Sequence, residues 1–117
     1  MFETLFAKKK PRVKDGRWKE FNKHGTLISV GNYRHGIKQG CWKEFYDTGE
    51  LMIEESYENG IVQGRFASYH RNGKVLSEGI YQKGKREGFF NVYDENGIYI
   101  MSLLFINNIL IKEFDKK

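Results

Sequence analysis

Apolar and polar positions recur along the chain with a period of 24 residues. Each period opens with two aromatic residues three positions apart, Trp18 and Phe21 in the first copy. A polar stretch that ends in glycine follows, and then an alternating apolar segment that runs to a further aromatic residue, Tyr33. Two short alternating segments joined by a glycine-containing turn are typical of a β-hairpin. The pattern therefore predicts a hairpin in each period.

The glycines and aromatic residues keep this spacing over nearly the whole chain. The columns are Gly16, Gly40, Gly64 and Gly88; Gly25, Gly49, Gly73 and Gly97; Gly36, Gly60 and Gly84; Trp18, Trp42, Phe66 and Phe90; and Tyr33, Tyr57, Tyr81 and Phe105. The two remaining glycines, Gly31 and Gly79, stand two periods apart. Asn108 takes a glycine position in the fourth copy, and asparagine tolerates the left-handed conformation best among the other residues. The chain is therefore built from four copies of one unit: Gly16–Gln39, Gly40–Gln63, Gly64–Glu87 and Gly88–Ile111.

Hairpins that follow one another through short turns are neighbours in space. We therefore predict an all-β domain: a single antiparallel meander sheet of four tandem hairpins, or eight strands, in an elongated open ribbon. Identical columns then stack into aromatic ladders. The glycine that ends each long turn, such as Gly49 or Gly73, is expected to hold a positive φ. Residues 1–14 form a basic lead segment with room for an extra strand at 2–6, residues 15–111 hold the repeats, and 112–117 form a charged tail.

Composition and charge narrow the class of protein further. The chain has 13 glycines and 18 aromatic residues but one proline and two alanines, which excludes a helical bundle. Four of the five net positive charges lie in residues 1–14, so the body is nearly neutral and a nucleic-acid partner is not expected. The single cysteine, Cys41, cannot form an internal disulfide, and no apolar run is long enough for a signal peptide or a membrane span. A cytoplasmic location is expected.

The repeat resembles a known family. Its pattern, G-x-W-x-x-[FY]-x-x-x-G-x-[LV] followed by Y-x-x-G-[IK]-x-x-G, resembles the MORN-repeat variant of bacterial proteins of the YwqK type, from Gly16 to Ile111. The resemblance implies an all-β array of hairpins without an active site. Many proteins of this type are regarded as antitoxins of toxin–antitoxin pairs. Other MORN repeats act as scaffolds, and some are linked to phospholipids or to self-association.

No group of residues in the sequence points to catalysis, to a metal or to a cofactor. The three histidines lie at turns of the first and third copies: His24, His35 and His70. Glu20 and Glu44 share a column and could form a carboxylate dyad, but Ser68 and Val92 replace them in later copies, so charge pairing across strands is the simpler explanation. Cys41 has no histidine placed to activate it. We expect a protein that is not an enzyme.

The last copy is the least regular one, because it is apolar where earlier copies are often polar. Its candidate contact residues are Leu103, Leu104, Phe105, Ile109, Leu110 and Ile111. Terminal repeats normally become more polar, and the edge of an open sheet can pair with another chain. We therefore predict that this end is covered by a second subunit through strand addition, in a homodimer or with another protein, in preference to cover by residues 112–117 with Phe114 as a plug.

The basic lead segment is the other candidate surface. Its cations are Lys8, Lys9, Lys10, Arg12 and Lys14, which could contact an anionic membrane weakly or could simply form a soluble leader, the favoured interpretation. The function predicted from the sequence is non-enzymatic protein binding or scaffolding, including antitoxin-like neutralisation of a partner toxin. The alternative is a peripheral module that binds anionic phospholipid surfaces.

Overall fold

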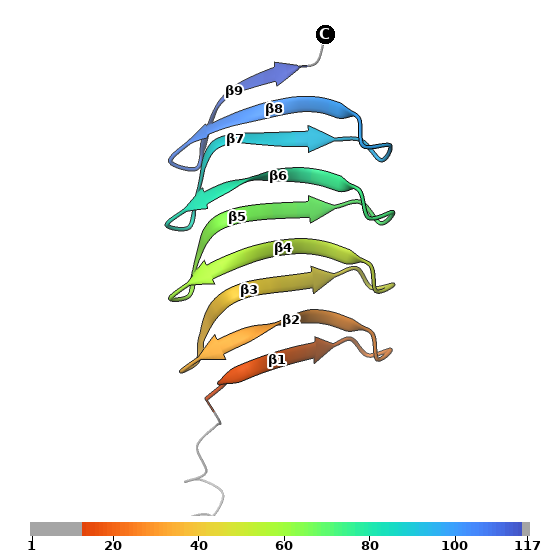
Figure 1. The fold of residues 1–117 in the computed structure, drawn as a ribbon, viewed down its shortest axis with the longest axis vertical. Helices are drawn as coiled ribbons and strands as arrows, with labels where there is room; N and C mark the ends of the chain where they lie inside the picture. Colours follow the sequence, from red (N-terminus) through yellow and green to blue (C-terminus); the bar gives the residue numbers. More distant parts are fainter. Residues whose placement is uncertain (1–12, 116–117) are drawn as a thin grey trace, which may run out of the picture.

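The computed structural model describes residues 13–115, and these form one antiparallel sheet whose strands follow one another in chain order (Figure 1). Figure 1 shows a single layer with the long turns along one edge and the short turns along the other. The strands are β1 (Gly16–Phe21), β2 (Leu27–Arg34), β3 (Ile37–Phe45), β4 (Leu51–Glu58), β5 (Ile61–Tyr69), β6 (Val75–Gln82), β7 (Lys85–Tyr93), β8 (Tyr99–Ile106) and β9 (Ile109–Asp115). The predicted all-β meander of hairpin repeats is confirmed.

The structure adds a ninth strand to the eight that the repeats predict. After the turn at Asn107 and Asn108, β9 pairs with β8 and continues through the expected end of the repeats at Ile111 as far as Asp115. It corresponds to the first strand of a fifth unit that has no second strand within the described residues. The extra strand expected at 2–6 lies outside the described residues, as do the last two lysines.

The two faces of the sheet differ, and we name them by the aromatic columns. The ladder face carries Trp18, Trp42, Phe66, Phe90 and Phe105 with the interleaved Tyr33, Tyr57 and Tyr81; the other side is the reverse face. Trp42 packs edge-on between two tyrosines, with ring centroids 5.0 Å from Tyr33 and 6.3 Å from Tyr57. Trp42 is only 3% exposed. Because residues 13–115 form a single sheet with no second layer, these aromatic contacts form most of its core, and the predicted ladder is confirmed.

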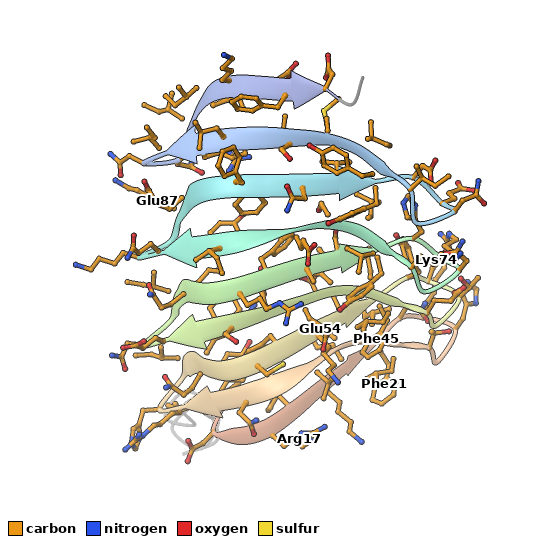
Figure 2. The ribbon with its side chains drawn as sticks, turned by 45° about the horizontal axis from the view of Figure 1, so that its top comes forward. Arg17, Phe21, Phe45, Glu54, Lys74 and Glu87 are labelled. Atoms are coloured by element: carbon orange, nitrogen blue, oxygen red, sulfur yellow. The ribbon has the colours of Figure 1, made fainter. Side chains whose placement is uncertain are left out.

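The short turns connect each repeat to the next through side-chain acceptors. The backbone N–H of Asn59 donates to Gln39 Oε1 at 3.0 Å, and the N–H of Asn107 donates to Glu87 Oε2 at 2.8 Å, each one repeat away. Figure 2 shows Glu87 at this edge of the sheet. Ile111 occupies the same column in β9, where no further short turn follows among the described residues. An acceptor is therefore not required there, which explains how the position can be apolar.

The long-turn glycines test the predicted backbone conformation directly. Gly49 and Gly73 have φ values of 104° and 90°, as expected, and Asn108 keeps its turn at φ 70°. We expect Gly49→Val and Gly73→Val each to lower the free energy of unfolding by about 1–3 kcal/mol, because a branched Cβ is strained at positive φ. Urea unfolding measures this. Lys23→Ala in the first long turn should change stability by less than about 0.5 kcal/mol. Glycine variants as stable as that control would contradict the prediction.

Candidate functional site

Exposed apolar side chains gather on the reverse face of the last four strands. This C-terminal apolar patch consists of the exposed Ile80, Phe89, Ile106, Ile109 and Phe114 together with the half-buried Leu104. Phe89 pairs with Leu104 across β7 and β8, and its ring lies 5.7 Å from that of Phe114 in β9. Phe89 is 54% exposed and Ile80 is 49% exposed. Large apolar side chains that are half exposed and adjacent over neighbouring strands are typical of a contact surface.

Most positions of the patch are polar in the first two copies, although Ile109 follows Ile37 and Ile61 in its column and Phe114 continues an aromatic column. Phe89 corresponds to Arg17, Cys41 and Arg65, whereas Ile80 and Leu104 correspond to Asn32 and Ser56. The same fold accommodates polar or charged side chains at these sites in β1–β5, so the hairpin does not need apolar residues there. Of the thirteen large exposed apolar residues in the described chain, nine lie at residue 80 or later. The enrichment therefore belongs to the surface of this end and not to the repeat itself.

Phe114 joins the patch through a one-residue change of register. In the inner hairpins a glycine at positive φ, such as Gly40 at 74°, begins a bulge on the odd-numbered strand. In β9 this glycine column is occupied by Lys112, which has no positive φ. The bulge there contains a single residue, Ile111. A shift of one residue turns each following side chain to the other face. Phe114, which falls in the tryptophan column of the repeat, therefore points to the reverse face beside Phe89.

The β9 edge lies next to the patch. All seven residues of β9 are exposed, and the strand pairs only with β8 within residues 13–115. An edge strand of this kind presents unpaired backbone N–H and C=O groups to a further chain. Ile109, Leu110 and Ile111 add apolar side chains at its start. The structure therefore combines an apolar surface and a strand edge at one end of the ribbon.

The structure divides the six residues predicted for this end. Ile109, Leu110 and Ile111 lie exposed on β9, and Leu104 belongs to the patch. Leu103 is half-buried on the ladder face. Phe105 is 5% exposed and packs against Phe90 with ring centroids 5.5 Å apart, so it belongs to the ladder and does not reach the surface. The sequence did not predict Ile80, Phe89 and Ile106, although comparison of Phe89 with Arg17 and Arg65 in its own column carries the signal, and it predicted Phe114 only as a plug for this end.

Only one cation of the basic lead segment is described. Lys8, Lys9, Lys10 and Arg12 lie outside the described residues. The Nζ atom of Lys14 lies over the rings of Trp18 and Tyr33, at 4.9 and 5.1 Å from their centroids. Lys38 covers Trp42 in the same way at 4.6 Å. Lys14 and Lys38 thus occupy the same position in successive repeats, and each covers the ladder by cation–π contact.

Ionisable side chains make structural contacts and do not converge on one point. Ser29 lies between Glu20 and Glu44 in the sheet, so these carboxylates are two strands apart and form no dyad. The hydroxyl of Tyr69 donates to Glu54, and this hydrogen bond together with burial raises the pKa of Tyr69 to about 12. Tyr69 thus stays a neutral donor. Within residues 13–115, no three histidine, cysteine or acidic side chains gather as metal ligands, and no helix is long and apolar enough to cross a membrane.

Comparison with protein families decides the class of the repeat. The model of the MORN repeat variant matches residues 14–35, 38–59 and 62–83, which together exceed half of the chain. The chain belongs to the MORN repeat variant family. No curated protein matches it. MORN repeats are generally modules that interact with proteins or membranes. All but one of the patch residues lie beyond the three matched MORN segments, in the part where the chain departs most from its own repeat.

Proposed function

We propose that this MORN-repeat protein is a non-enzymatic protein-binding module whose partner docks on the C-terminal apolar patch and the adjacent β9 edge. The observation that carries the proposal is the replacement of polar residues by Ile80, Phe89 and Leu104 in columns that the fold does not require to be apolar. Each such side chain contributes roughly 1.5–3 kcal/mol when it leaves water. A partner that covers several of them gains a substantial binding free energy, with Phe89 as the central anchor.

The neighbouring edge gives the partner a second means of attachment. A strand added to β9 forms backbone hydrogen bonds along the sheet while its side chains, or the segment that follows, cover the patch. A second copy of the chain can supply such a strand, and so can a different protein. The toxin-neutralising function implied by the sequence resemblance is the form of this proposal in which the partner is a toxin.

The patch can be tested by substituting the residues that the other copies carry. We expect Phe89→Arg combined with Ile80→Ser to abolish partner binding, with at least a tenfold loss of the retained partner in an affinity pull-down from the native lysate, because the anchor no longer buries apolar surface. Light scattering on the purified protein tests the homodimer form, for which the same variant should be monomeric. Circular dichroism and thermal unfolding should stay close to the unsubstituted protein, since Arg17, Arg65 and Ser56 already occupy these columns.

Ile61→Arg provides the matched control. It introduces the same charged side chain in place of an exposed isoleucine of an inner repeat, outside the patch and the β9 edge, and should leave both partner capture and oligomeric state unchanged. A double variant that still captures the same protein, with no change in assembly, would rule out the patch as the contact surface.

A further inference from the structure

The reverse face changes character along the ribbon, and its first three strands carry only positive charge. Arg17 and Lys19 in β1, Arg34 in β2 and Lys43 in β3 alternate onto this face, and all four are exposed. We call these four residues the basic half of the reverse face. The acidic residues of the same strands, Glu20 and Glu44, point to the ladder face. In these three strands the reverse face therefore carries no acidic side chain, whereas the ladder face carries both signs of charge, including Lys38 over Trp42.

The cations of the basic half are available for an external partner. Within the described residues, Arg17, Lys19 and Arg34 form no ion pair, and Lys43 reaches only Glu54, at 3.8 Å. That carboxylate also accepts the hydroxyl hydrogen of Tyr69, at 2.5 Å, which is the closer and stronger contact. Acidic side chains on the reverse face therefore compensate little of the positive charge of the basic half.

The reverse face is hollowed between the basic half and the C-terminal apolar patch, so one partner can lie across both regions. A hollow of about 220 Å³ lies between the basic half and the apolar patch, lined by the small side chains of Cys41, Ser56 and Ala67 together with Arg65 and Glu54 among others. The spacing of neighbouring strands places the basic half about 25 Å from the patch, a distance that an extended segment of about eight residues spans.

We infer that the basic half of the reverse face binds an acidic segment of the same protein partner that docks on the apolar patch. This inference rests on the proposed function, because it assigns a second contact to that partner. Residues 13–115 contain fourteen Lys and Arg and fourteen Asp and Glu, so the ribbon has no net charge to attract a polyanion over a distance. Glu20 and Glu44 lie on the other face of the same thin sheet, and their negative charges repel an extended anionic surface. Local pairing with a segment shaped to this face is what the arrangement favours.

The test uses the full-length chain and a fluorescent peptide of ten glutamates. Fluorescence anisotropy at about 20 mM salt measures binding, and about 0.5 M salt should remove it by screening. The combined variant Arg17→Gln, Lys19→Gln and Lys43→Gln should weaken binding at least fivefold. The matched control, Lys23→Gln, Lys74→Gln and Lys85→Gln, removes the same charge elsewhere and should stay within twofold of the unsubstituted protein. Both variants keep Lys8, Lys9 and Lys10, so any contribution from the lead segment cancels.

Amide chemical shifts locate the peptide independently of affinity. Addition of the peptide should shift the amides of β1–β3 and leave those of β6–β9 unchanged. Phe89→Arg must retain peptide binding, so loss of partner capture and loss of acidic-segment binding can be told apart. The inference would be overturned if the reverse-face triple variant and the control triple variant weakened peptide binding equally. It would also be overturned if the peptide shifted only the amides of other strands, or if the peptide did not bind. Binding to phosphatidylserine vesicles and to a single-stranded DNA 20-mer is measured with the same reverse-face triple variant. If that variant lost more of either binding than of peptide binding, the inference would also be overturned.

Discussion

Replacement of Gly31 by alanine is expected to lower the free energy of unfolding by about 3 kcal/mol. Gly31 lies on the ladder face opposite Trp18, and the indole of Trp42 lies directly over it. A Cβ built on Gly31 falls inside the van der Waals surface of that ring, and its nearest atoms all belong to Trp42. A methyl group there must displace the best-buried side chain of the sheet, and overpacking of this kind is costly. Urea unfolding measured by tryptophan fluorescence tests it.

Two comparisons separate this clash from a general effect of losing a glycine. Gly79→Ala should behave similarly, because its Cβ would lie 2.5 Å from the ring of Phe90. Gly25→Ala, whose Cβ meets no atom within 4 Å, carries only the strain of a positive φ and should cost about 1 kcal/mol. If Gly31→Ala were no more costly than Gly25→Ala, close packing of Trp42 on the backbone would not be the reason for glycine at this position.

Truncation of Trp42 to alanine is expected to cost about 3–5 kcal/mol, the largest effect of any single change in the ladder. The indole bridges the rings of Tyr33 and Tyr57, lies under the Nζ atom of Lys38, and donates its Nε1–H to the carbonyl of Asn32 at 3.1 Å. Its removal separates the ladder into two parts and exposes both neighbouring tyrosines. Thermal and urea unfolding followed by circular dichroism measure the loss.

Trp42→Phe is the matched control, because the third and fourth repeats carry Phe66 and Phe90 in this column. Phenylalanine keeps the edge-on contacts but loses the hydrogen bond to Asn32, so a cost of about 1–2 kcal/mol is expected. Equal losses for the alanine and phenylalanine variants would show that the hydrogen bond, and not the ladder, carries the stability.

Much of the fold follows from the 24-residue period. The spacing of Gly49 and Gly73 located the long turns and predicted their positive φ, and Asn108 was predicted to keep its turn without glycine. These predictions succeed because turn type and alternation are local properties, set by the φ range and side-chain direction of a few neighbouring residues. Repetition then determines the topology, since a hairpin joined by a short turn can only lie beside the previous one.

The candidate site could be predicted only in part from the sequence. An apolar last repeat pointed to Leu104 and Ile109, which do belong to the patch, but Phe105 was included although it lies buried in the ladder. Phe114 was expected at most as a plug in a charged tail. Burial depends on the neighbours that a side chain meets across the sheet, and column spacing alone does not show which of two faces those neighbours occupy.

The sequence by itself determined the hairpin unit, its number of copies, the meander order and the aromatic columns, because each depends on local conformation repeated at a fixed interval. The tertiary structure decided which residues share a face. Lys112 does not form the bulge that Gly40 begins in the inner repeats, so β9 is shifted by one residue and Phe114 turns towards Phe89. A strand has a side-chain period of two, and a single bulged residue is therefore enough to move a whole segment from the core to the binding surface.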